Sequence, residues 1–157
     1  MYKTGIGQDS HAFEKEGSEK KLMLGGAHIP GCPGLSGNSD ADVVLHALAN
    51  AISGISGENI LGKVSDRMCQ QGAADSAEYV KVALKTLGNY RITHASVAIE
   101  GKRPILSPHI DSMKKSIAKL LDIQPTDVGI TATSGEGLTA FGRGEGLQAF
   151  VIVTAEG

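Results

Sequence analysis

The sequence predicts an α/β (α+β) fold: a single domain, residues 1–157, in which helices pack on one face of a mostly β sheet. Three observations predict it. A chain of 157 residues has the length of one domain, and hydrophobic residues, 41% of the total, are enough for a core. Segments with strand-like alternation are interspersed with segments of helical periodicity. No repeat, linker or low-complexity segment divides the chain.

Two strands are predicted in the N-terminal part. Residues 2–8 (YKTGIGQ) are typical of a short strand, and residues 20–30 (KKLMLGGAHIP) of a second strand that ends at Pro30. We expect the charged segment AFEKEGSE between them to be a loop or hairpin. The glycine-rich residues 31–38 are expected to be irregular.

The clearest helix is predicted at residues 39–55 (SDADVVLHALANAISGI). Ser39 is a natural N-cap, and Asp40 and Asp42 suit the positive end of the helix dipole. One face carries an apolar stripe, formed by Val44, Leu48, Ala51 and Ile55.

The next two elements are a helix and a strand. Residues 74–88 are predicted to be a second helix, which stops at Gly88. Residues 90–100 (YRITHASVAIE) are predicted to be a strand, because alternate side chains form two sets that would point to opposite faces.

The last three elements are a helix and two strands. Residues 107–122 are predicted to form a third helix, with Ser107 as its cap and Pro108 at its first position. The apolar segments 127–133 and 145–155 are typical of strands. Three helices cover only one face of such a sheet, although Ala149–Val153 has few polar residues. We therefore expect oligomerisation through the other face.

Composition narrows the class of protein. The formal net charge of −2 lacks the basic balance of a nucleic-acid binder, so we expect no nucleic-acid partner. No apolar run approaches the ~20 residues of a membrane helix, so we expect no membrane partner. Cys32 and Cys69 form no metal-spaced motif and no disulfide framework, and residues 1–8 do not resemble a signal peptide. We expect a cytoplasmic protein, or a plastid one only if a transit segment has been removed.

The stretch GQDSHAF places Asp9 and His11 two residues apart, hence on one face of a strand. They are either a solvated pair or two thirds of a metal site. In the first helix, Asp42 and His46 are one turn apart and share a face, although a lone helical histidine is usually a core residue. Asp9, His11 and His46 together would supply the three protein ligands of a catalytic zinc site, with Asp42 supporting the site or the substrate.

Three further stretches are candidates for anion or base binding. Residues 37–42 (GNSDAD) begin a helix, where free N–H groups favour anions, but plain capping explains them equally. Residues 131–146 (TATSGEGLTAFGRGEG) gather hydroxyls, Glu136 and Arg143 among glycines, which favours phosphate and magnesium binding over a simple hairpin. Residues 101–110 (GKRPILSPHI) form a proline-fixed loop whose backbone could bind the edge of a base, although a structural role is the simpler interpretation.

In this order, GQDSHAF, GLSGNSDADVVLHAL and TSGEGLTAFGRGEG resemble the 2-C-methyl-D-erythritol 2,4-cyclodiphosphate synthase family, and the resemblance covers nearly the whole chain. It implies a homotrimer with active sites between neighbouring subunits. It implies a substrate in which a CDP group and a second phosphate are attached to methylerythritol. That phosphate attacks the β-phosphate, CMP leaves and a cyclic diphosphate forms. Such phosphoryl transfer depends on positioning and on neutralising charge.

The resemblance also implies roles for residues. Asp9, His11 and His46 match the ligands of zinc or another divalent transition metal, and Glu136 matches the acid that holds magnesium or manganese. Asn38 and Ser134 match catalytic positions. The residues at substrate-binding positions are Asp9, Ser10, His11, Asn38, Ser39, Asp42, Gly62, Gly101, Lys102, Arg103, Pro104, Ile105, Leu106, Ser107, Thr133, Ser134, Gly135, Glu136, Phe141 and Arg143.

The chain departs from the family pattern at three places. Asn38 stands where histidine is common, and asparagine donates a hydrogen bond but carries no positive charge. Ile60 stands where an aspartate contacts the ribose, with Glu58 and Asp66 as open alternatives. Residues 64–75 (VSDRMCQQGAAD) replace a phenylalanine-proline-aspartate loop, so the flap differs. Two other functions remain open: a zinc-dependent phosphohydrolase, and a non-catalytic ligand-binding trimer.

Overall fold

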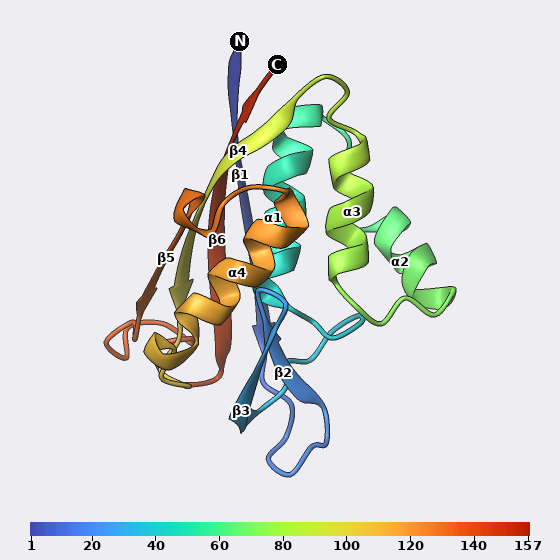
Figure 1. The fold of residues 1–157 in the computed structure, drawn as a ribbon. Helices are drawn as coiled ribbons and strands as arrows, with labels where there is room; N and C mark the ends of the chain where they lie inside the picture. The colour runs from blue at the N-terminus through green and yellow to red at the C-terminus, as the bar shows by residue number, and fades with distance from the viewer.

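The computed structural model describes residues 1–157, which form one domain with a curved sheet on one side and helices on the other (Figure 1). The strands are β1 (Tyr2–Ala12), β2 (Lys21–Leu24), β3 (Ala27–Pro33), β4 (Arg91–Glu100), β5 (Val128–Thr133) and β6 (Gly146–Glu156). The helices are α1 (Val43–Ser56), α2 (Lys63–Gln70), α3 (Ala77–Lys85) and α4 (Ile110–Leu121), with 3-10 turns η1 (Ser107–His109) and η2 (Pro125–Asp127).

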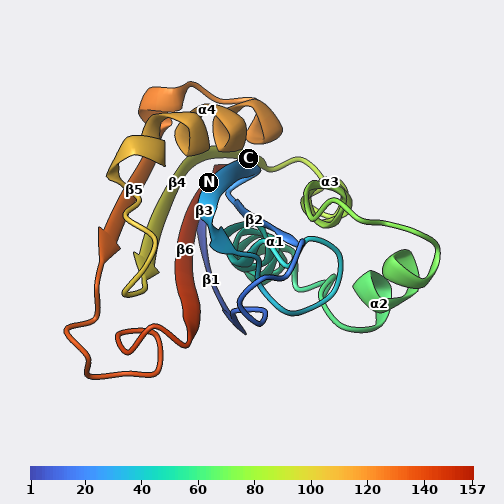
Figure 2. The ribbon, with the colours of Figure 1, turned by 90° about the horizontal axis from the view of Figure 1, so that it is seen from below.

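The main sheet has the strand order β1-β6-β4-β5, and only β4 and β5 are parallel. The crossover between these two strands contains α4, as parallel neighbours require. In the β1–β6 ladder, Asp9 lies opposite Ala149 and His11 opposite Leu147. Figure 2 shows α1, α3 and α4 on one face of the sheet, which confirms the predicted α+β arrangement with helices on a single face.

The predicted strand 20–30 is wrong as one element, because β2 and β3 form a hairpin. Gly25 and Gly26 turn the chain between them with φ values of 59° and 78°, which glycine adopts without steric cost. The hairpin forms a separate two-stranded sheet.

The helix predictions are corrected in three respects. Helix α1 begins at Val43, and its N-cap is Asp42 instead of Ser39, which lies in the turn before it. A short polar helix, α2, occupies part of the flap segment 64–75, for which no helix was predicted, so the chain has four α-helices and not three. Helix α3 ends at Lys85, and the third predicted helix begins with η1 before α4.

Close contact between β1 and α1 depends on two glycines. A Cβ atom on Gly7 would lie 2.0 Å from the carbonyl oxygen of Ala47, and one on Gly5 would lie 2.0 Å from that of Ala51. No side chain fits at such distances, so only glycine lets the strand lie directly on the helix backbone. This contact sets the distance between the end of β1 and the first turns of α1.

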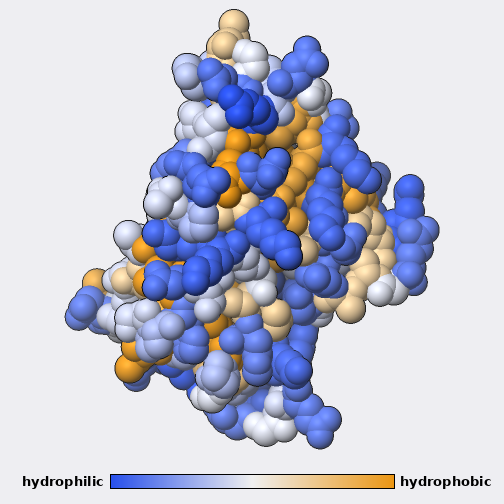
Figure 3. Space-filling view, viewed as in Figure 1, coloured by the Kyte–Doolittle hydropathy of each residue, from blue (hydrophilic) through white to orange (hydrophobic).

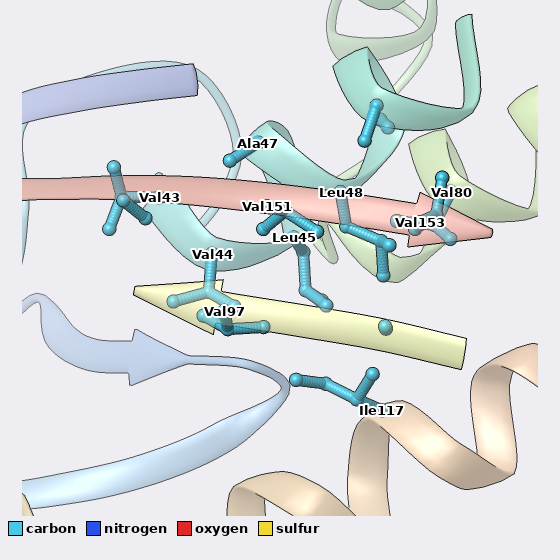
Figure 4. Packing of buried hydrophobic residues seen from close by; sticks show 14 of the residues in the cluster. Val43, Val44, Leu45, Ala47, Leu48, Val80, Val97, Ile117, Val151 and Val153 are labelled. Atoms are coloured by element: carbon cyan, nitrogen blue, oxygen red, sulfur yellow. The ribbon is translucent and has the colours of Figure 1, made fainter. Parts of the chain in front are cut away.

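The core lies between the sheet and the helices (Figure 4). Valines of β4 and β6 face leucines on α1, and Ile117 reaches the same layer from α4; all are fully or almost fully buried. On the helix side, the surface is mostly hydrophilic, with an apolar strip where α1 lies between β4 and α3 (Figure 3). None of the helices has the length and apolar composition needed to cross a bilayer.

No helix covers the opposite face of the sheet. Ile6, Phe150 and Ile152 lie on that face and are 63%, 43% and 45% exposed. Two neighbouring strands thus present large apolar side chains away from the helices.

Candidate functional site

The sequence predicts that Asp9, His11 and His46 meet, and the structure brings them together. Asp9 and His11 lie on the face of β1 that contacts α1, and His46 lies in the first turns of α1. His11 Nε2 and His46 Nδ1 lie 2.8 and 3.1 Å from Asp9 Oδ2, and 3.2 Å from each other. One oxygen and two imidazole nitrogens therefore converge on one point, and one ligand atom from each residue lies within 4.8 Å of the others.

This donor set fits a divalent transition metal. Ligand atoms about 2.0–2.1 Å from a tetrahedral ion are themselves about 3.3 Å apart, which is close to the separations found here. Two imidazoles and a carboxylate suit zinc and its neighbours better than magnesium, which prefers oxygen. Burial acts to raise the pKa of Asp9, but hydrogen bonds and charge interactions with His11 and His46 outweigh it and lower that pKa to about 2. The carboxylate is thus ready to bind a cation at neutral pH.

The turn before α1 is shaped to lie against the histidines. A Cβ atom on Gly37, whose φ is 150°, would lie 2.9 Å from two ring atoms of His11, so this position requires glycine. Ser39 and Ala41 have φ values of 54° and 52°, a strained conformation for residues with side chains. Asn38 is exposed and its Nδ2 donates a hydrogen bond of 2.8 Å to Asp66 Oδ1 on α2, so the turn and the flap helix are joined.

Asp42 has a structural role instead of the predicted role beside His46 or the substrate. Its side chain is fully buried, so it does not reach a ligand. The carboxylate accepts hydrogen bonds from four backbone N–H groups, those of Val44, Leu45, Gly25 and Gly26, at 2.7–3.1 Å. Asp42 therefore caps α1 and anchors the β2–β3 hairpin to it.

His46 has further partners that the sequence did not indicate. Its Nε2 lies 2.8 Å from Ser76 Oγ, and Ser76 donates a hydrogen bond to the carboxylate of Asp40. The ring of Tyr79 packs against the imidazole, with centroids 5.5 Å apart. Ser76 and Tyr79 lie at the start of α3, 30 or more residues from His46, so no local pattern could have identified them.

A second candidate site lies across the sheet from the first, where β4 and β5 end. Predicted residues from two segments line a cavity of about 300 Å³ there, together with Ile110 and Ala132: Gly101, Lys102, Pro104, Ile105, Leu106, Ser107, Thr133 and Ser134. Backbone hydrogen bonds of 3.0 Å join the segments, from Gly101 to the carbonyl of Thr133 and from Lys102 to that of Phe141. The loop after β4 and the loop after β5 thus form one pocket.

The glycine-rich loop 134–145 projects beside this pocket. Glu136 is exposed, has a positive φ of 52°, and its N–H donates to Ser134 Oγ at 3.3 Å. Arg143 pairs with Glu145 at 3.0 Å on the surface. At the loop's base, Thr139 donates a hydrogen bond to the carboxylate of Glu100 and accepts one from the N–H of Gly142.

Three further predicted residues belong neither to the metal-binding cluster nor to the lining of the pocket. Ser10 is exposed on the opposite face of β1 from Asp9 and His11. Arg103 forms an ion pair of 2.8 Å with Glu16 and lies over the ring of Phe13. Gly62 is exposed as the N-cap of α2.

Ile60 is 4% exposed and belongs to the hydrophobic core. The position at which the family pattern has an aspartate therefore has no polar group in this chain. Glu58 and Asp66 are both exposed, and Asp66 accepts the hydrogen bond from Asn38.

Within one chain, the metal-binding cluster and the pocket are separated by the width of the sheet. The cluster lies at the end of β1 and the pocket at the ends of β4 and β5, with β6 between β1 and β4. From β1 to β5 there are three strand spacings, or about 14 Å. The two centres lie at the same end of the strands, because Gln148 of β6 pairs with both Ser10 and Glu100, and Glu100 pairs with Thr133.

The chain is similar to known proteins over nearly its full length. The YgbB family model matches residues 2–156. The 2-C-methyl-D-erythritol 2,4-cyclodiphosphate synthase of Chlamydia abortus is 47% identical over 156 residues, which cover 98% of this chain and 89% of that protein.

Solved structures have the same fold. The bifunctional IspDF from Campylobacter jejuni matches with a TM-score of 0.88 and 29% identity; the match covers 99% of this chain but only 42% of that protein. A CDP-bound 2C-methyl-D-erythritol-2,4-cyclodiphosphate synthase matches with a TM-score of 0.81 and 25% identity, over 98% of this chain and 100% of that one. With the family model covering residues 2–156, these likenesses show that the chain belongs to the YgbB family.

Proposed function

We propose that the chain is a 2-C-methyl-D-erythritol 2,4-cyclodiphosphate synthase of isoprenoid precursor biosynthesis. It would convert 4-diphosphocytidyl-2-C-methyl-D-erythritol 2-phosphate to the cyclic diphosphate with release of CMP, and so act as a phosphorus–oxygen lyase. The convergence of Asp9, His11 and His46 in a chain 47% identical to such a synthase carries this proposal. The CDP-bound relative supports a CDP-linked ligand.

The chain's own residues would bind and orient the substrate. The pocket of about 300 Å³ offers the backbone of residues 101–107 to cytosine, and Lys102 is the one charged residue of its lining. Thr133 and Ser134 lie on its wall and offer hydroxyls to the diphosphate oxygens. Asn38, exposed beside the metal-binding cluster, would donate a hydrogen bond to the charge that develops during transfer.

Metal ions would supply the positive charge that a chain of net charge −2 lacks. Asp9, His11 and His46 would hold zinc or another divalent transition metal, and exposed Glu136 would hold magnesium or manganese.

A trimer would complete the active site. In one chain, β1, which carries two residues of the cluster, and β5, which borders the pocket, are three strand spacings or about 14 Å apart. Pairing the cluster of one subunit with the pocket of the next would bring both to one substrate. The apolar sheet face with Ile6, Phe150 and Ile152 is the surface that such an assembly would bury.

The test is CMP release from the CDP-linked substrate, with phosphorus NMR of the product. We expect a cyclic diphosphate from the wild type and a loss of at least ~100-fold in His46→Ala, with His28→Ala, an exposed histidine on β3, as the matched control. Undiminished release in His46→Ala would contradict the metal-centre assignment. A linear product would instead identify a zinc-dependent phosphohydrolase.

The non-catalytic alternative has specific support in Ile60, which is buried, and in Asn38, which already binds Asp66. Binding of CDP by the wild type without turnover would establish it.

A further inference from the structure

His46 is the one member of the metal-binding cluster whose two ring nitrogens both have side-chain partners. Nδ1 faces Asp9 and His11 at 3.1 and 3.2 Å, while Nε2 faces Ser76 Oγ at 2.8 Å on the opposite side of the ring. Ser76 is fully buried and His46 is 5% exposed, so water does not compete for this contact. The orientation of the imidazole is therefore decided by protein groups.

Counting protons fixes the direction of these hydrogen bonds. The carboxylate of Asp40 accepts only, so the single hydroxyl proton of Ser76 is donated to Asp40, while Ser39 Oγ, 2.9 Å from Ser76 Oγ, donates to the carbonyl of Asn38. Ser76 Oγ then has only lone pairs for His46, and Nε2 of His46 must carry the proton. Because Nε2 donates to Ser76, Nδ1, which lies 3.1 Å from the Asp9 carboxylate, is the nitrogen that would give its lone pair to an ion at the shared point between Asp9 and His11.

Asp40 is itself held in place. Its Oδ1 accepts a hydrogen bond of 3.1 Å from the N–H of Asp42, the cap of α1, and its Oδ2 lies 3.4 Å from the N–H of Ser76. The carboxylate thus joins the start of α1, which carries His46, to the start of α3, which carries Ser76. It also lies on the wall of a cavity of about 360 Å³ between the hairpin, α3 and α4.

We propose that Ser76 and Asp40 are positioning residues for the metal centre. This inference rests on the proposed role of His46 as a metal ligand. Ser76 fixes the proton of His46 on Nε2 and the orientation of the ring. Asp40 polarises the hydroxyl of Ser76, and through this hydroxyl it strengthens the donation of the Nδ1 electron pair to the metal. Such outer partners of a metal-binding histidine typically change metal affinity by about 10–100-fold when removed.

The experiment measures zinc affinity of the metal-free full chain by competition with a chromophoric chelator. We expect Ser76→Ala to bind zinc about 10–100-fold more weakly than the wild type. Asp40→Asn keeps the size and an acceptor but loses the charge, so we expect a smaller loss of several-fold. The matched control is Ser53→Ala, which removes another buried serine hydroxyl, one on α1 that has no hydrogen-bond partner; its affinity should equal that of the wild type.

Long-range proton–nitrogen NMR of His46 gives a readout that a loss of packing would not mimic. In the zinc-loaded wild type, the Nε2 proton should be shifted downfield and slow to exchange with water because it is hydrogen-bonded to Ser76 Oγ, and Ser76→Ala should lose both features with the fold intact by circular dichroism. If Ser76→Ala does not fold, Asp40→Asn carries the test. A folded variant with the zinc affinity and the Nε2 proton signal of the Ser53→Ala control would overturn the role of the residue it replaces. Absence of zinc binding in the wild type would overturn both this inference and the metal centre of the proposed function, whereas binding that only His46→Ala abolishes would overturn this inference alone.

Discussion

At the scale of single residues, several charged and polar groups near the candidate site serve the fold, not the chemistry. Asp42 shows this most clearly, because its carboxylate is buried beneath α1 and binds four backbone N–H groups. Burial raises the pKa of this carboxyl from 3.8 to about 6, although the hydrogen bonds from Gly26, Leu45 and Gly25 oppose the rise. Asp40, two residues before Asp42, instead connects to His46 through Ser76.

The raised pKa of Asp42 predicts a pH dependence of stability. Between about pH 4 and pH 6 the native state binds the proton more tightly than the unfolded state, so this stabilisation is full below pH 4 and is lost as pH rises through 6. Two pKa units correspond to about 3 kcal/mol. Urea unfolding should be measured for the wild type and for Asp42→Asn, whose side chain does not titrate. The unfolding free energy of the wild type minus that of the variant should fall by up to ~3 kcal/mol from pH 4 to pH 7. A difference that stays constant or grows with pH would show that the N–H groups outweigh burial.

At the scale of secondary-structure elements, the site depends on how closely α1 approaches β1. Gly7, two residues before Asp9, permits the carbonyl of Ala47, the residue after His46, to lie where a side chain would be. The strand supplies two ligands on one face, and the helix supplies the third from across that contact.

We therefore expect Gly7→Ala to destabilise the protein and to weaken the metal centre. The new methyl group would overlap the Ala47 carbonyl at 2.0 Å, and overpacking of this kind costs about 1–3 kcal/mol or more. Thermal unfolding and zinc affinity should both fall. Gly129→Ala in β5 is the matched control, because a Cβ there has nothing within 4 Å and no unfavourable φ; equal effects of the two changes would contradict the close-contact account.

Sequence patterns predicted the elements whose signals are local. Alternation in GQDSHAF placed Asp9 and His11 on one face, and the periodicity of residues 39–55 placed His46 on a helix. Helix α2 was missed because KVSDRMCQ is short and polar, so it has no apolar stripe to detect. The cap of α1 was misplaced because both Ser39 and Asp42 are good N-cap residues, and only the contact of Asp42 with the hairpin decides between them. Ser76 and Asp40 meet His46 through packing between α1 and α3, which no single segment encodes.

At the scale of the whole molecule, one chain presents a metal-binding cluster, a separate pocket and one apolar sheet face that no helix covers. The metal-binding cluster is complete within the subunit, whereas the pocket beside β5 has no metal ligands from β1 near it. In the proposed trimer, metal binding thus needs only one subunit, whereas turnover needs two neighbouring subunits.

The variant Ile152→Asp tests whether turnover needs the trimer while metal binding does not. A charge on the apolar sheet face should convert a trimer to a monomer by light scattering and reduce CMP release by at least ~100-fold, because burying an unpaired carboxylate is costly. Zinc affinity should stay within about threefold of the wild type, since its ligands all lie in one chain. Lys85→Asp on α3 is the control for the added charge. Full activity in a monomeric Ile152→Asp variant would show that each subunit works alone.

The pairing of β1 with β6, in which His11 lies opposite Leu147, has a consequence for sequence change in this region. Because neighbouring side chains alternate between faces, deleting one residue within β1 just before Asp9, with the start of the strand held in place, would turn the carboxylate and the imidazole to the helix-free side together. Homologous sequences should therefore contain insertions and deletions in the charged loop after β1 far more often than inside the strand.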